Sequence, residues 1–146
     1  MANKLLAALD PLIGDWDVVL SKARFFEDPD DTIRGEAKVS RELDDAVVLM
    51  RVAYADDRMP IGKWVIGVDD DREGYSVLYN DDRGVSRICQ MSFDDGVLDI
   101  WRHATGFTQK FNARLDRAGK VLSGEWQFCE DGMNWHRDFR VDYSRR

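Results

Sequence analysis

The feature that most constrains this chain is a two-residue alternation of apolar and polar side chains that runs from Gly14 almost to the C-terminus. The alternation comes in short segments separated by turn sequences such as Asp95-Gly96 and Asp131-Gly132. Successive side chains of a β-strand point to opposite faces, so this pattern is typical of half-buried strands joined by hairpins. It predicts strands at residues 14–25, 31–43, 46–56, 62–69, 73–80, 84–94, 96–103, 107–116, 120–130 and 134–144.

These strands predict an all-β fold, a closed or nearly closed antiparallel meander barrel, because closure removes the exposed edges of a long sheet. Residues 2–10 carry Leu5, Leu6 and Leu9 at helical spacing, and Pro11 ends the pattern, which predicts one short N-terminal helix. No linker or internal repeat divides the sequence. We therefore expect residues 1–146 to form a single barrel domain.

Composition excludes several classes of function. The net charge of −7 and the lack of a Lys/Arg cluster other than Arg145-Arg146 disfavour a nucleic-acid partner. No apolar run approaches the roughly 20 residues that a membrane span needs, so no membrane association is expected. The first ten residues lack a secretory signal, which predicts a cytoplasmic location with Cys89 and Cys129 reduced. No cysteine, histidine or carboxylate spacing is typical of a metal site, and no cofactor is expected.

Strand parity identifies the side chains expected to face the barrel interior. In the predicted strands 62–69, 73–80, 84–94 and 107–116, the side chains expected to face inward include Trp64, Ile66, Tyr75, Val77, Tyr79, Arg87, Met91, Gln109 and Phe111. The last two strands add Trp126, Phe128, Trp135, Arg137, Phe139, Val141 and Tyr143. In segment 96–103 both faces carry apolar residues, and Trp101 favours the set Val97, Asp99, Trp101 and His103.

Several segments carry a family resemblance. Leu12-Ile13-Gly14-Asp15-Trp16 resembles the Gly-x-Trp signature of lipocalin-like (calycin) barrels. Asp31-Thr-Ile-Arg-Gly-Glu-Ala, Tyr79-Asn-Asp-Asp-Arg-Gly-Val-Ser-Arg87, Gly124-Glu-Trp-Gln-Phe and Trp135-His-Arg-Asp-Phe-Arg-Val-Asp-Tyr143 together resemble a bacterial lipocalin-like family of unknown function. The strand count is similar to that of fatty-acid-binding proteins and of nitrobindins, which bind haem. The resemblance implies a cup with one helical cap and a ligand cavity, but it assigns no ligand.

Trp16 has an expected structural role. Closure of the barrel pairs the first strand with the last, so Trp16 should lie near residues 143–145. The guanidinium of Arg145 or Arg146 could then stack on the Trp16 ring and plug that end of the barrel.

The interior is expected to be aromatic but not purely apolar, and this is the clearest functional signal. A buried guanidinium must meet a carboxylate, water or a ligand's negative group. The pattern predicts a small-molecule binding protein whose cavity holds a partly apolar, anionic organic ligand, a hydrophobic or amphipathic molecule anchored by Arg87 and Arg137. Fatty-acid-binding barrels are similar in using interior Arg and Tyr for a ligand carboxylate. The candidate ligand-binding residues are Trp64, Tyr79, Arg87, Met91, Trp101, His103, Gln109, Phe111, Trp126 and Arg137.

Other readings stay open. Arg87 or Arg137 could pair internally with Asp99. His103, two residues from Asp99, could act as a general base in an isomerase or cyclase, although we assign no catalytic residue. A nitrobindin-like haem site could use His103, or His136, which parity places outward.

The last reading is a solid barrel that serves as an interaction module. Val48, Met50, Val52 and Tyr54 supply apolar side chains on the second face of their strand. A water-exposed apolar face would be unusual for an isolated barrel, so it predicts a possible homodimer.

Overall fold

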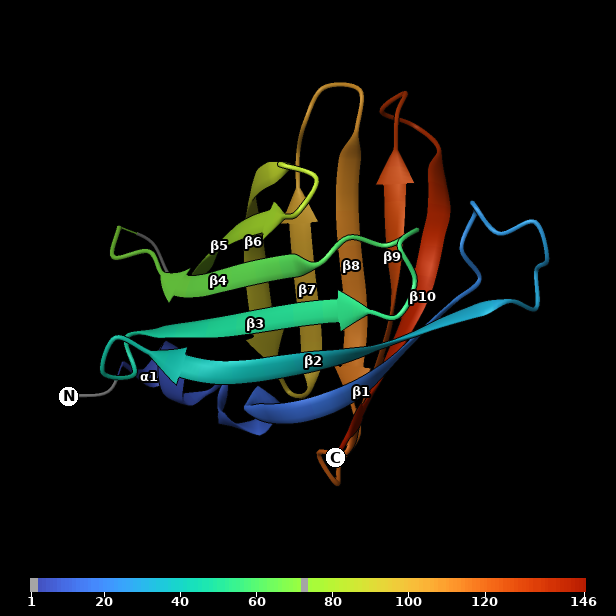
Figure 1. Cartoon of the computed structure of the whole chain (residues 1–146). Coiled ribbons are helices and arrows are strands. Elements are labelled where there is room, and N and C mark those ends of the chain that lie inside the picture. Colours follow the sequence, from blue (N-terminus) through green and yellow to red (C-terminus); the bar gives the residue numbers. More distant parts are fainter. Residues whose placement is uncertain (1–2, 72–73) are drawn as a thin grey trace.

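A computed structural model describes residues 3–71 and 74–146, and over these residues the chain forms a closed barrel of ten antiparallel strands with a short helix before it (Figure 1). The strands are β1 (Gly14–Ser21), β2 (Thr32–Glu42), β3 (Val47–Tyr54), β4 (Gly62–Val68), β5 (Tyr75–Asp81), β6 (Ser86–Asp94), β7 (Val97–Arg102), β8 (Thr108–Leu115), β9 (Val121–Cys129) and β10 (Trp135–Arg145). Each strand pairs with its neighbour in sequence, and β1 also pairs with β10.

The predicted fold class, an all-β closed meander with one short N-terminal helix, is confirmed. Every predicted strand overlaps an observed one, and most differences are confined to one or two residues at the ends, where turns begin. The first strand ends earlier than expected, at Ser21, because residues 22–31 form a loop. Residue 2 of the predicted helix and residue 73 of the predicted fifth strand lie outside the described residues.

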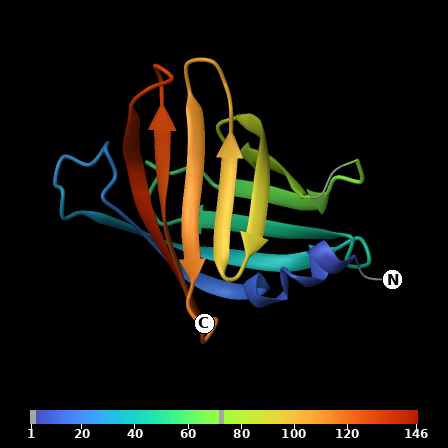
Figure 2. The same ribbon diagram turned by 180° about the vertical axis from the view of Figure 1, so that it is seen from behind.

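The N-terminal segment covers one end of the barrel, on the side where β1 begins (Figure 2). Helix α1 (Lys4–Ala7) and the 3-10 turn η1 (Asp10–Leu12) bury Leu6, Leu9 and Leu12 in the main hydrophobic core. Asn3 caps the helix by accepting a hydrogen bond from the backbone of Leu5. No helix among the described residues is long and apolar enough to cross a lipid bilayer.

The expected contact between Trp16 and the C-terminal strand is confirmed. Trp16 lies opposite Arg145 in the β1–β10 register, and the Arg145 guanidinium carbon is 4.2 Å from the indole ring centroid. The same guanidinium donates hydrogen bonds to three backbone carbonyls, those of Pro11, Ile13 and Gly119. Arg145 therefore ties the last strand to the N-terminal turn and closes this end.

Strand β7 corrects the expected parity. Leu98 and Ile100 are buried, so Asp99 and Trp101 lie on the outer face. Two purely apolar side chains gain more from burial than a tryptophan, whose ring N–H needs a partner. The Trp101 indole donates to the side-chain oxygen of Gln90 on the outer face at 2.7 Å.

Strand β10 corrects a second parity prediction. A β-bulge lies between Arg137 and Phe139, where Phe139 pairs with the inward Trp126 but Arg137 pairs with the outward Gln127. The extra residue reverses the parity of the first part of the strand. Arg137 and Trp135, predicted inward, therefore lie on the outer face, and Trp135 contacts the Lys110 ammonium at 3.9 Å.

Strand β3 removes the argument offered for a homodimer. Val48 and Val52 are buried, and Met50 and Tyr54 pack against the main core, so these four side chains face the interior. The surface that was expected to dimerise through them is therefore not an outer surface.

Candidate functional site

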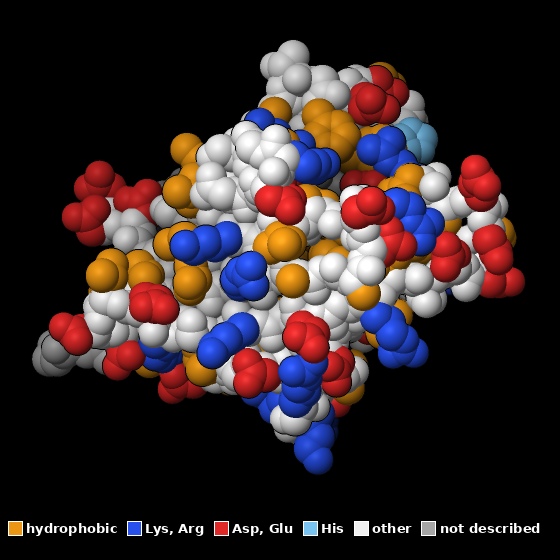
Figure 3. Space-filling model, in the orientation of Figure 1, with side chains coloured by type: hydrophobic (Ala, Val, Ile, Leu, Met, Phe, Trp, Pro, Cys, Tyr) orange, Lys and Arg blue, Asp and Glu red, His pale blue; other side chains and the backbone are white. Residues whose placement is uncertain are grey.

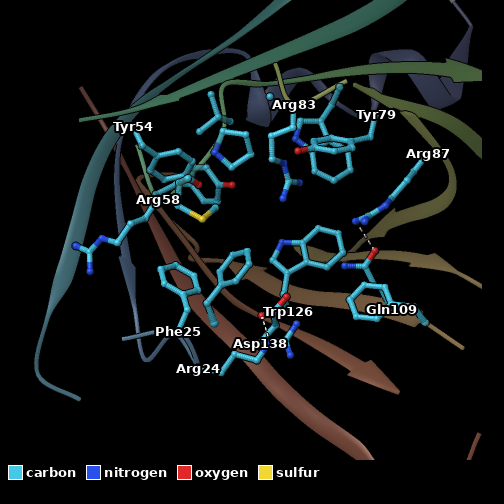
Figure 4. Close-up of a pocket in the computed structure, with 18 residues that line it drawn as sticks. Arg24, Phe25, Tyr54, Arg58, Tyr79, Arg83, Arg87, Gln109, Trp126 and Asp138 are labelled. Carbon is cyan, nitrogen blue, oxygen red and sulfur yellow. Dashed lines mark hydrogen bonds and ion pairs between the residues drawn. The ribbon is translucent and has the colours of Figure 1, made fainter. Parts of the chain in front are cut away.

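A cavity of about 560 Å³ lies at the end of the barrel opposite the helix (Figure 4). Five loops meet at this open end, because strands β1, β3, β5, β7 and β9 run toward it and the following strands run back. The lining residues are Arg24, Phe25, Val52, Tyr54, Arg58, Met59, Pro60, Gly62, Trp64, Tyr79, Arg83, Arg87, Phe107, Gln109, Trp126, Asp138, Phe139 and Tyr143.

An aromatic stack crosses the interior. The Tyr79 ring lies 4.4 Å from Trp64, Trp64 lies 5.7 Å from Trp126, and Trp126 lies 5.0 Å from Phe111. The first three rings line the cavity, and Phe111 supports them from the core. The Tyr79 and Trp64 rings are tilted by 48°, whereas Trp126 is stacked with both Trp64 and Phe111, and such ring contacts stabilise the aromatic cluster.

A small apolar void of about 40 Å³ lies toward the closed end. Trp64 and Tyr143 line both this void and the main cavity, so they separate the two spaces. The other side chains around the void, including Met91, are apolar. The polar groups of the interior therefore face the main cavity.

Three of the four arginines that line the cavity have carboxylate partners. The pairs are Arg24 with Asp138 at 2.9 Å, Arg58 with Asp56 at 2.6 Å and with Asp31 at 3.2 Å, and Arg83 with Asp81 at 2.7 Å. Hydrogen bonds from Arg58 lower the pKa of Asp56 to about 2. Burial raises the pKa of Asp81, but hydrogen bonds from Arg83 and Tyr79 outweigh it and lower that pKa to about 2. The ion pairs with these aspartates therefore already balance the three guanidiniums.

Arg87 is the exception. Its partly buried guanidinium donates to the side-chain oxygen of Gln109 at 3.0 Å, and no carboxylate among the described residues forms an ion pair with it. The Phe107 ring lies 5.6 Å away, at the long end of a cation–π contact. In Figure 4 Arg87 and Gln109 lie together on one side of the cavity, facing Trp126. Of the four arginines that line the cavity, Arg87 therefore lacks a carboxylate partner among the described residues.

Three tyrosines line the cavity as neutral phenols. Burial raises the pKa of Tyr54, and burial together with a hydrogen bond to Asp81 raises that of Tyr79. Burial, and then the charge of Tyr54, raise the pKa of Tyr143 well above its usual value. These hydroxyls keep their protons across the physiological pH range and can donate hydrogen bonds.

The structure brings together half of the candidate residues that the sequence suggested. Trp64, Tyr79, Arg87, Gln109 and Trp126 line the main cavity. Two others are buried beside it: Met91 borders the apolar void and Phe111 supports Trp126.

The remaining three candidates, Trp101, His103 and Arg137, lie away from the cavity. Trp101 and Arg137 are on the outer face, and Arg137 lies 3.7 Å from Glu125 there. His103 lines a separate surface depression formed by the β7–β8 and β9–β10 loops. The expectation that these three face the interior is therefore wrong.

The alternatives built on Asp99 also fail on geometry. Its carboxylate accepts a hydrogen bond from Asn112 at 2.6 Å on the outer face, so it pairs with neither Arg87 nor Arg137 inside. Asp99 and His103 do not share the cavity in which a general base would act.

For haem, the structure places both imidazoles outside the cavity lining. The bulge places His136 on the same face of the sheet as Phe128, which is the opposite of the expected outward direction. The two ring centroids lie 5.5 Å apart, and His136 is exposed at the rim of the barrel. Neither histidine is among the described residues that line the cavity, so this part of the wall provides no imidazole for an axial bond to haem iron.

Parity reasoning missed the residues contributed by loops. Arg24, Phe25, Arg58 and Arg83 come from connections, where no alternation applies. A sequence signal did exist, since Asp56-Asp57-Arg58 and Asp81-Asp82-Arg83 repeat one triplet. In both triplets the first aspartate binds the arginine two residues later, and both arginines line the cavity.

The outer surface has a different character from the cavity. Over the face shown in Figure 3, lysine and arginine side chains are interspersed with aspartate and glutamate side chains. Acidic residues are frequent in the β1–β2 loop, which carries Glu27, Asp28, Asp30 and Asp31. Arg87, which has no carboxylate partner within residues 3–71 and 74–146, thus lines the cavity of a chain of net charge −7.

This architecture is that of a calycin-like β-barrel with an internal aromatic cluster. The chain is similar in structure to Rv2717c from M. tuberculosis, with a TM-score of 0.66 and 15% sequence identity over 100% of this chain and 99% of that one. At this identity the likeness establishes the fold alone. No family model and no curated protein matches the sequence.

Proposed function

We propose that this chain binds a small, planar organic acid with a single negative charge in the cavity at the open end of the barrel. The observation that carries the proposal is the Arg87 guanidinium, which lines the cavity and whose hydrogen-bond partner among the described residues is the neutral Gln109 side chain alone. A partly desolvated charge without a counter-charge is costly, and an anionic ligand would relieve that cost.

The charge of the ligand follows from the pairing of the other arginines. Arg24, Arg58 and Arg83 are each balanced by at least one aspartate. A second negative charge on the ligand would find no free cation among the described residues that line the cavity. The proposed ligand is therefore a monoanion.

Gln109 is proposed as the second anchor. Its carbonyl oxygen accepts the Arg87 hydrogen bond, and its amide NH₂ donates to no described residue. An arginine and an amide side by side present a fork of donors suited to the two oxygens of a carboxylate.

The shape of the cavity supports a planar molecule. Its volume of about 560 Å³ is typical of small-ligand sites, which combine apolar walls with a few polar groups. Trp64, Trp126 and Tyr79 contribute aromatic side chains to the same cavity wall as Arg87. An aromatic ring with an attached carboxylate would use both features.

Titration calorimetry with 2-naphthoate and its neutral analogue 2-naphthylmethanol tests the proposal. We expect Arg87→Gln to weaken naphthoate binding about tenfold to a hundredfold, the range for a lost charge-assisted hydrogen bond, and to leave the alcohol unaffected. Arg114→Gln is the matched control, because Arg114 lies on the exposed outer face of β8. Equal naphthoate affinities for wild type and Arg87→Gln would refute the anchor.

A further inference from the structure

The four tyrosines of the chain divide into two pairs by their hydrogen bonds. The Tyr75 hydroxyl donates to the backbone carbonyl of Leu5, and the Tyr79 hydroxyl donates to Asp81 at 2.7 Å. The hydroxyls of Tyr54 and Tyr143 have no hydrogen-bond partner among the described residues. Both of these tyrosines line the cavity.

These two hydroxyls reach open space in the cavity. Among the described residues, no side-chain nitrogen or oxygen that is sealed from solvent lacks a partner. The unpartnered hydroxyls of Tyr54 and Tyr143 are therefore not sealed, although Tyr143 as a whole is only 8% exposed. A buried residue that keeps one polar atom on a cavity, unpaired, is suited to meet a ligand atom there.

The two tyrosines lie apart from Arg87: Tyr54 is where β3 ends, and Tyr143 is at the boundary between the cavity and the apolar void. Tyr54 ends β3 and Tyr143 is on β10, whereas Arg87 is on β6, three strands from β3 and four from β10 in the barrel order. Figure 4 shows Tyr54 on the opposite side of the cavity from Arg87, with Arg83 between them and Trp126 below. The cavity therefore has two polar ends joined by an aromatic surface.

We propose that Tyr54 and Tyr143 form a second subsite, which donates hydrogen bonds to an uncharged carbonyl oxygen of the ligand. This inference deepens the proposed function and rests on it, because it concerns the same cavity and the same molecule. The ligand class becomes an aromatic monoanion that carries a ketone or similar carbonyl at a distance from its acidic group.

An uncharged acceptor fits these groups better than a second acid. Buried phenols that hold their protons donate hydrogen bonds but supply no positive charge. Arg58, which lines the cavity from the loop after β3, is already paired with Asp56. A carboxylate here would be buried without a counter-charge, whereas a carbonyl only needs donors.

Four probe types separate the two subsites. The meta and para isomers of benzoylbenzoate carry both a carboxylate and a ketone, and the matching benzylbenzoates replace the ketone by a methylene. Benzophenone and diphenylmethane repeat that change without the carboxylate. Affinities are measured by tryptophan fluorescence and calorimetry for wild type, Tyr54→Phe/Tyr143→Phe and the control Tyr75→Phe, whose hydroxyl is bonded outside the cavity.

We expect the better benzoylbenzoate isomer to bind wild type about tenfold more tightly than its benzyl analogue, as two hydrogen bonds allow. The ratio should fall to about one in the double variant and stay unchanged in Tyr75→Phe. Circular dichroism checks the fold. If the buried Tyr143 does not tolerate the change, Tyr54→Phe alone should lower the ratio about threefold.

The outcomes distinguish the two proposals. A ratio near one in wild type, or a ratio unchanged in the double variant, overturns the carbonyl subsite, while weaker binding of both acids by Arg87→Gln still supports the anion site. Binding of benzophenone in preference to diphenylmethane, with no gain from the carboxylate, supports the subsite and overturns the anion proposal. Failure of every probe to bind overturns both.

Discussion

Replacement of Arg87 and replacement of Arg145 should affect the stability of the ligand-free protein very differently, although both are partly buried arginines in the same barrel. Replacement by methionine keeps most of the apolar stem and removes the charge. At position 145 the change removes hydrogen bonds to three backbone carbonyls and the stacking on Trp16. At position 87 it removes one hydrogen bond to Gln109 and relieves a charge without a counter-charge.

The magnitudes follow from these contacts. Hydrogen bonds from a charged donor contribute about 1.5–3 kcal/mol each and are not additive, so Arg145→Met should cost at least about 3 kcal/mol. For Arg87→Met the loss of one such hydrogen bond, about 1.5–3 kcal/mol, opposes a desolvation gain of about 1–3 kcal/mol, so the two nearly cancel and the net change should lie within about 1 kcal/mol of zero. An unfolding entropy of about 2.1 cal/mol/K per residue converts these values to falls in Tm of about 10 °C for Arg145→Met and changes within about 3 °C for Arg87→Met.

Urea and thermal unfolding without ligand, followed by tryptophan fluorescence and circular dichroism, measure both variants under one set of conditions. The reasoning requires a large loss for Arg145→Met and a change near zero, or a gain, for Arg87→Met. An equal loss for the two variants would show that Arg87 holds the barrel together, and it would remove the main argument for a ligand anchor.

Three further results are expected. Gly124→Ala should destabilise the barrel by about 1–3 kcal/mol in urea unfolding, because an added Cβ would lie 2.8 Å from the Phe111 ring; wild-type stability would refute this packing. Since Arg83 helps to hold the pKa of Asp81 at about 2, below its usual 3.8, Asp81→Asn should cost stability at pH 7, and this cost should shrink as pH falls from about 4 to 2. A pH-independent difference would contradict that assignment. Burial raises the pKa of the Cys89 thiol, so iodoacetamide should alkylate it only after unfolding, and rapid labelling of the folded protein, located by mass spectrometry, would count against its burial.

The fold could be predicted from the sequence because the alternation of apolar and polar residues indicates the strands, and Asp and Gly residues indicate the turns. The same pattern placed Trp64, Tyr79 and Arg87 inside, on strands where one face is clearly more apolar than the other. Parity depends on that contrast. Where it was weak, as in β7, a single large residue, Trp101, misled the assignment, although an indole bonded to Gln90 is stable on the outer face.

The rest of the site depends on features that alternation does not encode. A bulge at Asp138 reverses the parity of Arg137 and turns the Asp138 side chain to the cavity instead. Tyr54 was assigned to an outer apolar face because β3 is apolar on both faces. Arg24 comes from a loop, where only the tertiary contact with Asp138 fixes the direction of the side chain.

The most direct test of the central claim is a crystal structure of the protein with meta- or para-benzoylbenzoate. The account predicts that the carboxylate lies within hydrogen-bond distance of Arg87 and Gln109, with a ring against Trp126. It also predicts the ketone oxygen at Tyr54 and Tyr143. A cavity that stays free of the acid at saturating concentration, or an acid bound at another surface, would contradict the account.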